Sequence, residues 1–151
     1  MSAIIRRMQT TDLDQVYAIE TQVHITPWSK EILRDCVLVG YDCRVLELDQ
    51  DILGYIISRK GASELHILNL CVRKDKQSQG YGRQLIEKVL QAIIESTAIK
   101  SVVLEVRPSN VTALHLYTSL GFQQSELKKN YYKDGESTED AVFLKKVLTR
   151  S

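Results

Sequence analysis

The sequence of 151 residues contains little cysteine, little proline and almost no net charge. Its three cysteines, Cys36, Cys43 and Cys71, are odd in number and form no Cys-x-x-Cys pair. This argues against a disulfide framework or a zinc site and favours a reducing compartment. The formal net charge is +1, from 20 Lys and Arg against 19 Asp and Glu, so no overall field attracts nucleic acid or a membrane. We therefore expect any charged substrate to be recognised locally.

Long apolar runs and a signal-peptide core are also missing. The opening MSAIIRRMQTTDLD has no such core, and the longest apolar runs are too short to span a bilayer. The expected location is the cytoplasm. A chain of this length with 44% hydrophobic residues fits one globular domain, residues 1–151. Such a domain buries roughly 70% of its unfolded surface.

Hydrophobic periodicity predicts the element order βααβββαβαββ, which is an α+β fold with a mixed sheet. The first part should hold a strand at SAIIRR, a helix opened by a capping box of Thr11 and Asp14, and a helix capped by Ser29. Their inner faces should carry apolar side chains: Leu13, Val16, Tyr17 and Ile19 in the first helix, and Ile32, Leu33 and Cys36 in the second.

The period then changes to that of strands. DCRVLELDQDILGYIISRK alternates around a turn at residues 49–51 and predicts a hairpin, and ELHILNLCV supplies a further strand. The stretch at 72–94 ends as a helix of about four turns. SVVLEVR is expected to be a strand, SNVTALHLYTSLGF a helix capped by Ser109 and stopped by Gly121, and AVFLKKVL the last strand.

A glycine-rich turn, Gln77-x-x-Gly80-x-Gly82, stands between a strand and this helix. Glycine costs about 1 kcal/mol against alanine inside a helix, so two glycines at a helix start indicate that backbone approaches a ligand closely. The unpaired N–H groups and the positive helix end suit a pyrophosphate. The turn is no Walker A loop, and Leu85 stands where a dinucleotide fingerprint needs a third glycine or alanine. An ordinary glycine-rich turn is the alternative for this motif alone.

Two polar residues occupy apolar settings. Glu105 shares one face of its strand with Val103, while its neighbours on the other face are apolar, so both faces look buried. Burial without a cation raises the pKa of a carboxyl group and makes it a competent general base. A glutamate paired with an arginine, or exposed near the strand end, is the alternative. Tyr117 points inward from its helix, and the alternative for it is a core tyrosine.

The motifs together are more specific than each alone. LHILNLCV, the Q-x-x-G-x-G turn, LEVRPSN and ALHLYTSLGF resemble, in this order and spacing, the GNAT superfamily of acetyl-CoA-dependent N-acetyltransferases. HITPWS, LEVRPSNVTALHLYTSLGF and NYYKDGESTEDAVFL resemble the narrower RimI type, which acetylates the N-terminal alanine of a small-subunit ribosomal protein. The resemblance covers nearly the whole chain. It implies a GNAT fold with a mixed, largely antiparallel central sheet flanked by helices, and splayed strands at the acetyl-CoA site.

The resemblance implies Glu105 as the catalytic base and Tyr117 as the acid that protonates the sulfur of coenzyme A. It further implies that the backbone at the end of one strand faces the thioester, that Asn110 contacts the pantetheine arm and that the turn holds the pyrophosphate. The residues for these cofactor contacts are Leu70, Cys71, Val72, Ser78, Gln79, Gly80, Tyr81, Gly82, Arg83 and Asn110. The family often has arginine where this chain has Ser78, and a small residue where Cys71 stands.

We expect the acceptor groove to be built by Pro27, Trp28, Asn130, Tyr131 and Tyr132, the alternative being that these aromatic residues only cover the core edge. The acidic residues Glu20, Asp134, Glu136 and Glu139 could receive a basic peptide, with solvated surface as their alternative. No metal is expected, because the histidines His24, His66 and His115 show no ligand spacing and fit structural or surface positions.

The leading hypothesis is an N-α-acetyltransferase that acts on the N-terminal segment of a small-subunit ribosomal protein. An α-amino group, with a pKa of about 8 against about 10.4 for lysine, is the easier amine to deprotonate. Two alternatives stay open: a GNAT enzyme for a small amine such as a polyamine or aminoglycoside, and a non-catalytic acyl-CoA-binding regulatory domain. The presence of both Glu105 and Tyr117 counts against the second alternative, because binding alone needs neither.

Overall fold

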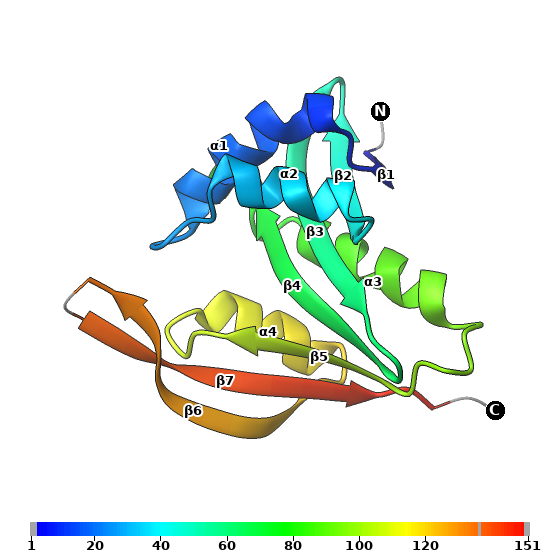
Figure 1. The fold of residues 1–151 in the computed structure, drawn as a ribbon, viewed down its shortest axis with the longest axis vertical. Helices are drawn as coiled ribbons and strands as arrows, with labels where there is room; N and C mark the ends of the chain where they lie inside the picture. Colours follow the sequence, from blue (N-terminus) through cyan, green and yellow to red (C-terminus); the bar gives the residue numbers. More distant parts are fainter. Residues whose placement is uncertain (1–2, 136, 150–151) are drawn as a thin grey trace. The chain divides into compact units, whose positions relative to one another are not determined.

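The computed structural model describes residues 3–135 and 137–149. Its seven strands form a sheet in the order β1-β2-β3-β4-β5-β7-β6 (Figure 1). The β4–β5 pairing is parallel, whereas β1–β2, β2–β3, β5–β7 and β6–β7 are antiparallel. The mixed, largely antiparallel sheet and the predicted element order are thus confirmed. The elements are β1 (Ile4–Arg7), η1 (Thr10–Asp12), α1 (Leu13–Val23), α2 (Lys30–Leu38), β2 (Asp42–Leu48), β3 (Asp51–Lys60), β4 (Glu64–Val72), η2 (Lys74–Lys76), α3 (Tyr81–Ile93), β5 (Ser101–Val106), α4 (Val111–Ser119), β6 (Gln123–Asp134) and β7 (Ser137–Val147).

The chain divides into two compact units. The first comprises Met1–Arg59 and Leu68–Glu95, and the second comprises Lys60–Ile67 and Ser96–Ser151, so β4 contributes to both. Within the described ranges, no helix combines the length and the apolar character needed to cross a bilayer.

In the first unit, helices pack on both faces of the β2–β3 hairpin. Tyr55 and Ile57 lie in the core cluster formed with α1 and α2. Gly54 points to the other face, where a Cβ would lie 3.3 Å from Leu85 of α3 and 2.7 Å from the carbonyl oxygen of Cys71. Because strand side chains alternate, these contacts place α3 opposite α1 and α2. Gly54 permits the close approach of the β4 backbone to β3.

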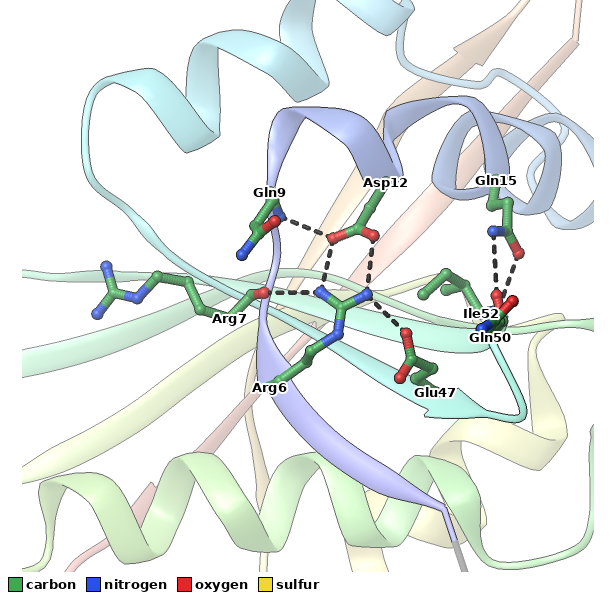
Figure 2. Close-up of polar contacts among 8 residues, drawn as sticks. All are labelled: Arg6, Arg7, Gln9, Asp12, Gln15, Glu47, Gln50 and Ile52. Atoms are coloured by element: carbon green, nitrogen blue, oxygen red, sulfur yellow. Dashed lines mark hydrogen bonds and ion pairs between the residues drawn. The ribbon is translucent and has the colours of Figure 1, made fainter.

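A hydrogen-bonded cluster joins β1 to the start of α1 in the first unit (Figure 2). The Arg6 guanidinium donates two hydrogen bonds to the Asp12 carboxylate, at 2.8 and 2.9 Å, and one to Glu47 at 2.9 Å. The Asp12 carboxylate also accepts the Gln9 N–H at 2.8 Å. Hydrogen bonding from Arg6 lowers the pKa of Asp12. Further along α1, the Gln15 side chain binds the hairpin backbone by accepting the Ile52 N–H at 2.8 Å.

In the second unit, β5 lies between the first part of β4 and β7. The parallel pairing with β4 joins Glu64, Leu65 and His66 to Ser101, Val102 and Val103, and the described residues show no further pair between these two strands. One face of β5 is buried, with Val102, Leu104 and Val106 each at most 6% exposed. Beyond this pairing, β4 continues to Val72 and β5 to Val106.

Several local expectations were wrong. The capping box uses Gln9 and Asp12 instead of Thr11 and Asp14, because a 3-10 turn precedes α1. Tyr17 and Ile32 are 36% and 47% exposed, so the apolar stripes of α1 and α2 are narrower than predicted. The cap of α4 is Asn110, whose side chain accepts the Ala113 N–H at 3.2 Å, instead of Ser109. The Ser29 cap of α2 and the hairpin turn are confirmed, while Ser2 of the first predicted strand lies outside the described residues.

Candidate active site

The glycine-rich turn has the predicted position between β4 and α3. Gln77 Nε2 donates a 3.0 Å hydrogen bond to the Val72 carbonyl and so closes the loop onto the end of β4. Ser78 and Gly80 both have left-handed backbone angles, with φ of 64° and 87°. Glycine at 80 tolerates this angle at no steric cost.

The start of α3 presents backbone N–H groups to a ligand. Gly80 is the N-cap residue and has no side chain to cap the helix, and the Gln84 N–H donates to the Gly80 carbonyl at 3.1 Å. A Cβ at Gly80 would meet no heavy atom within 4 Å, so the space above the turn is open. Gln79 and Arg83 are exposed beside it. The positive end of the helix dipole and this open backbone suit a phosphate group.

The end of β4 contributes Leu70, Cys71 and Val72. Cys71 is buried at 2% exposure, whereas Leu70 and Val72 point to the opposite face and are half-buried. Burial raises the pKa of the Cys71 thiol well above its usual range, so the side chain is a neutral thiol. The backbone of this strand end lies directly before the glycine-rich turn.

Glu20 fixes the loop that carries Pro27 and Trp28. Its carboxylate is 1% exposed and accepts hydrogen bonds from the Trp28 N–H at 2.9 Å, the Asn69 amide at 2.7 Å and the Tyr55 hydroxyl. The Trp28 side chain is half-buried against the core. The suggestion that Glu20 receives a basic peptide was therefore wrong, because this carboxylate is an internal anchor.

His24 joins the same cluster and is not a simple surface residue. Its Nε2 lies 3.0 Å from Asn69 Oδ1 and 2.9 Å from Cys71 Sγ. Sequence spacing accounts for the members of each pair lying together, but it does not set which pairs meet. Glu20 and His24 are four residues apart at the end of α1, and Asn69 and Cys71 are two apart on β4, so each pair lies on one face.

Glu105 of β5 faces a histidine. Its Oε2 lies 2.6 Å from His66 Nε2, and the two side chains are 18% and 25% exposed. His66 pairs with Val103 in the β4–β5 register, so Glu105 is two residues further along the neighbouring strand. The Glu105 carboxylate therefore has an imidazole as its partner, instead of the arginine that the alternative for Glu105 named. The partial exposure of both groups leaves the pair accessible.

Tyr132 lies within the electrostatic reach of Glu105. Burial raises the pKa of Tyr132 to about 12, with the charge of Glu105 adding to the effect, so the phenol is protonated at neutral pH. The Arg107 guanidinium lies over the Tyr132 ring, with its Cζ 4.1 Å from the ring centroid. Arg107 also binds Asp134 at 2.8 Å and Glu139 at 3.3 Å. Asp134 and Glu139 are thus paired with Arg107, so the alternative of simple solvated surface was wrong for them. Glu136 lies outside the described residues.

A bulge in β6 presents Tyr131. Lys128 faces Ala141 and Tyr132 faces Glu139, so residues 129–131 lie opposite Asp140 alone. Asn130 has a φ of 54°, and its N–H donates to Asp140 Oδ1 at 2.9 Å. Tyr131 is 46% exposed and packs edge-on against Phe143. Backbone irregularity at this position aims an aromatic side chain outward.

Tyr117 of α4 is buried at 6% exposure, and its ring lies edge-on to Phe122 with centroids 5.7 Å apart. The inward orientation is confirmed. The predicted residues thus gather in two groups: the turn, the β4 end and the Trp28 loop belong to the first unit, whereas Glu105, Asn110, Tyr117 and the β6 residues belong to the second.

The chain has a glycine-rich turn between a strand and a helix, and a glutamate on the next strand in the sheet order. A known family matches a sequence of this kind. The model of the acetyltransferase (GNAT) family matches residues 6–122. The chain therefore belongs to the GNAT acetyltransferase family.

Individual relatives narrow the class. The chain is 33% identical over 140 residues to the ribosomal protein bS18-alanine N-acetyltransferase of Escherichia coli K12, covering 93% of this chain and 94% of that protein. The crystal structure of the ribosomal-protein-S18-alanine N-acetyltransferase from Escherichia coli matches with a TM-score of 0.89 and 30% identity, over 99% of this chain and 96% of that chain. Arabidopsis thaliana NAA60, solved in complex with acetyl-CoA, shares the fold at a TM-score of 0.88 and 17% identity, over 97% of this chain and 99% of that chain. The chain is accordingly an N-acetyltransferase of the GNAT family.

Proposed function

We propose that the protein transfers the acetyl group of acetyl-CoA to the α-amino group of the N-terminal alanine of a small-subunit ribosomal protein, in the cytoplasm. The observation that carries this proposal is the 33% identity, over nearly the full length of both chains, to a ribosomal protein bS18-alanine N-acetyltransferase. We further propose that the two units act as one domain spanning residues 1–151, since the family model extends across residues of both.

In this proposal, acetyl-CoA binds through the turn and the β4 end. The backbone of residues 78–83 and the positive end of α3 hold the pyrophosphate, because anions are stabilised at a helix start. The backbone of residues 70–72 faces the thioester, and the N–H of Val72 is the proposed donor to the oxyanion that develops on the carbonyl. Asn110 contacts the pantetheine arm in addition to capping α4.

Glu105 is the proposed base. It accepts a proton from the acceptor ammonium, directly or through a water, and the neutral amine then attacks the thioester carbonyl. His66 holds the Glu105 carboxylate in place at 2.6 Å and supplies the orientation that proton transfer requires. Collapse of the tetrahedral intermediate releases the thiolate of coenzyme A, which Tyr117 protonates. The attacking nitrogen loses its second proton to solvent as the amide forms, and the Tyr117 phenolate regains a proton from solvent. An α-amine has a pKa of about 8, so the base has less work with an N-terminus than with lysine.

The proposed acceptor site comprises Pro27 and Trp28 from the first unit and Asn130, Tyr131 and Tyr132 from the second. Two observations support it. The Trp28 loop is fixed through its N–H to the buried Glu20, and the β6 bulge exposes Tyr131. Rigid, partly exposed aromatic side chains supply contact area at a low cost in conformational entropy.

Acetylation of matched peptides tests the proposal. A hexapeptide beginning with Ala and carrying basic residues further in should gain one acetyl group on its α-amine, as located by tandem mass spectrometry. Its N-terminally blocked copy with a free lysine should stay unmodified. Equal rates on the blocked peptide and on spermidine would overturn the protein acceptor. In a separate assay, saturating acetyl-CoA should raise the Tm, because a ligand at 100 times its Kd adds about 2.7 kcal/mol to folding stability.

A further inference from the structure

Three side chains of metal-binding type meet in the first unit. Glu20 lies on α1, His24 directly follows this helix, and Cys71 lies on β4. One ligand atom from each residue lies within 4.8 Å of the other two. His24 Nε2 is 2.9 Å from Cys71 Sγ and 3.7 Å from Glu20 Oε1.

These separations can be compared with the edges of a coordination tetrahedron. Zinc bonds of about 2.0–2.3 Å in tetrahedral geometry place neighbouring ligand atoms about 3.3–3.6 Å apart. The His24–Glu20 separation of 3.7 Å is close to this range, whereas His24 and Cys71, at 2.9 Å, would have to move apart by roughly half an ångström to admit an ion. The His24 side chain is 35% exposed, whereas Glu20 is 1% exposed, so the cluster is open to solvent at its imidazole.

The surroundings already orient the ligands. The Tyr55 hydroxyl, the Asn69 amide and the Trp28 N–H donate to the Glu20 carboxylate, which is the role that outer hydrogen bonds play around metal ligands. Asn69 Oδ1 lies 3.0 Å from His24 Nε2 and 3.5 Å from Cys71 Sγ, so this oxygen atom is available as a fourth ligand.

We propose that Glu20, His24 and Cys71 bind a Zn²⁺ ion, with the Asn69 oxygen or a water molecule in the fourth position. One carboxylate, one imidazole and one thiolate suit Zn²⁺, whereas Mg²⁺ and Ca²⁺ require oxygen ligands. On binding, the Cys71 thiol proton leaves to solvent and a zinc–sulfur bond replaces the contact between the thiol and His24. The ion would tie the end of α1 to β4. The zinc proposal does not rest on the proposed acetyl transfer, although its ligands adjoin that site: Glu20 anchors the Trp28 loop, and Cys71 lies on the strand end proposed to face the thioester.

Cobalt substitution tests the proposal without any turnover measurement. Addition of Co²⁺ to the metal-free full-length protein should produce a thiolate-to-cobalt charge-transfer band and intense visible bands of tetrahedral type, both removed by one equivalent of Zn²⁺. Cys71→Ala and His24→Ala should weaken Zn²⁺ binding by at least about 10²-fold, and Tyr55→Phe, which loses only an outer contact, by about 10-fold to 100-fold.

The chain offers matched controls. Cys36→Ala removes another buried cysteine, and His115→Ala removes an exposed histidine. Both variants should keep the cobalt absorption bands and the Zn²⁺ affinity of the native protein. Native circular dichroism of Cys71→Ala would show that the variant folds. The absence of a charge-transfer band in the native protein, or its persistence in Cys71→Ala, would reduce the cluster to a hydrogen-bonded network and overturn the proposal.

Discussion

At the scale of single residues, Glu105 is the proposed base, and His66 lies 2.6 Å from its carboxylate. We expect Glu105→Gln to lower kcat by about 10²-fold or more while acetyl-CoA affinity stays unchanged, because the amide cannot accept the amine proton. The loss should shrink at high pH, where the acceptor amine is already neutral. Initial rates from pH 6 to 10, with cofactor affinity from calorimetry, give the measurement. Full activity at pH 7 would remove Glu105 from the mechanism.

In the proposed mechanism His66 acts through Glu105, so we expect the loss of His66 to cost less activity than the loss of Glu105. His66→Ala should lower kcat by about 10-fold with little change in the KM for acetyl-CoA, because the carboxylate keeps its chemistry and loses its fixed position. The matched control is His115→Ala on the exposed face of α4, which should keep the native rate. An equal effect of the two variants, or a change confined to KM, would contradict a positioning role.

The Arg6–Asp12 pair makes stability depend on pH. Asp12→Asn should lower the free energy of unfolding by about 1–3 kcal/mol near neutral pH, because the charge-assisted bonds to Arg6 are lost. The folded-state pKa of Asp12 lies below its ordinary value of 3.8, so this stabilisation is present above pH 3.8 and disappears as the pH falls toward the folded value. Urea unfolding at several pH values should show the two proteins converging in acid. Asp75→Asn breaks an exposed pair with Arg73 and should leave stability almost unchanged.

At the scale of elements, the turn between β4 and α3 allows a matched pair of glycine substitutions. Gly80 and Gly40 have φ of 87° and 88°, and a Cβ at either meets nothing within 4 Å. Alanine at each should therefore cost a similar free energy of folding, about 1–2 kcal/mol. Only Gly80→Ala should also weaken acetyl-CoA binding, because its methyl group enters the space proposed for the pyrophosphate. Equal cofactor affinity in both variants, measured by calorimetry, would place the phosphate site elsewhere.

Elements were largely predictable from the sequence, and contacts between distant segments were not. Periodicity placed β4 at Glu64–Val72 and the start of α3 at the glycine pair, because these signals are local. The pairing of Glu105 with His66 joins residues 39 apart and depends on the β4–β5 register, which periodicity does not set. The same holds for Cys71, which meets His24 across 47 residues. The shift of the α4 cap from Ser109 to Asn110 is an ordinary competition between two adjacent capping residues.

At the scale of the whole molecule, the proposed function requires a peptide acceptor. Three observations support a peptide acceptor. They are the match to a ribosomal protein bS18-alanine N-acetyltransferase, the contact of Glu105 with His66 and the exposure of Tyr131. Remote contacts help to position the amine, so shortening the peptide to two residues should lower kcat/KM strongly. Trp28→Ala should lower kcat/KM for the hexapeptide by as much as this shortening does. For the dipeptide, the same variant should keep nearly the native kcat/KM.

The most direct measurement is the mass of a small-subunit ribosomal protein that begins with alanine, incubated with acetyl-CoA and either the native protein or Glu105→Gln. We predict a single acetyl group on the N-terminal alanine with the native protein, and almost none with the variant in the same time. An unmodified N-terminus, or acetyl groups found only on lysines, would contradict it.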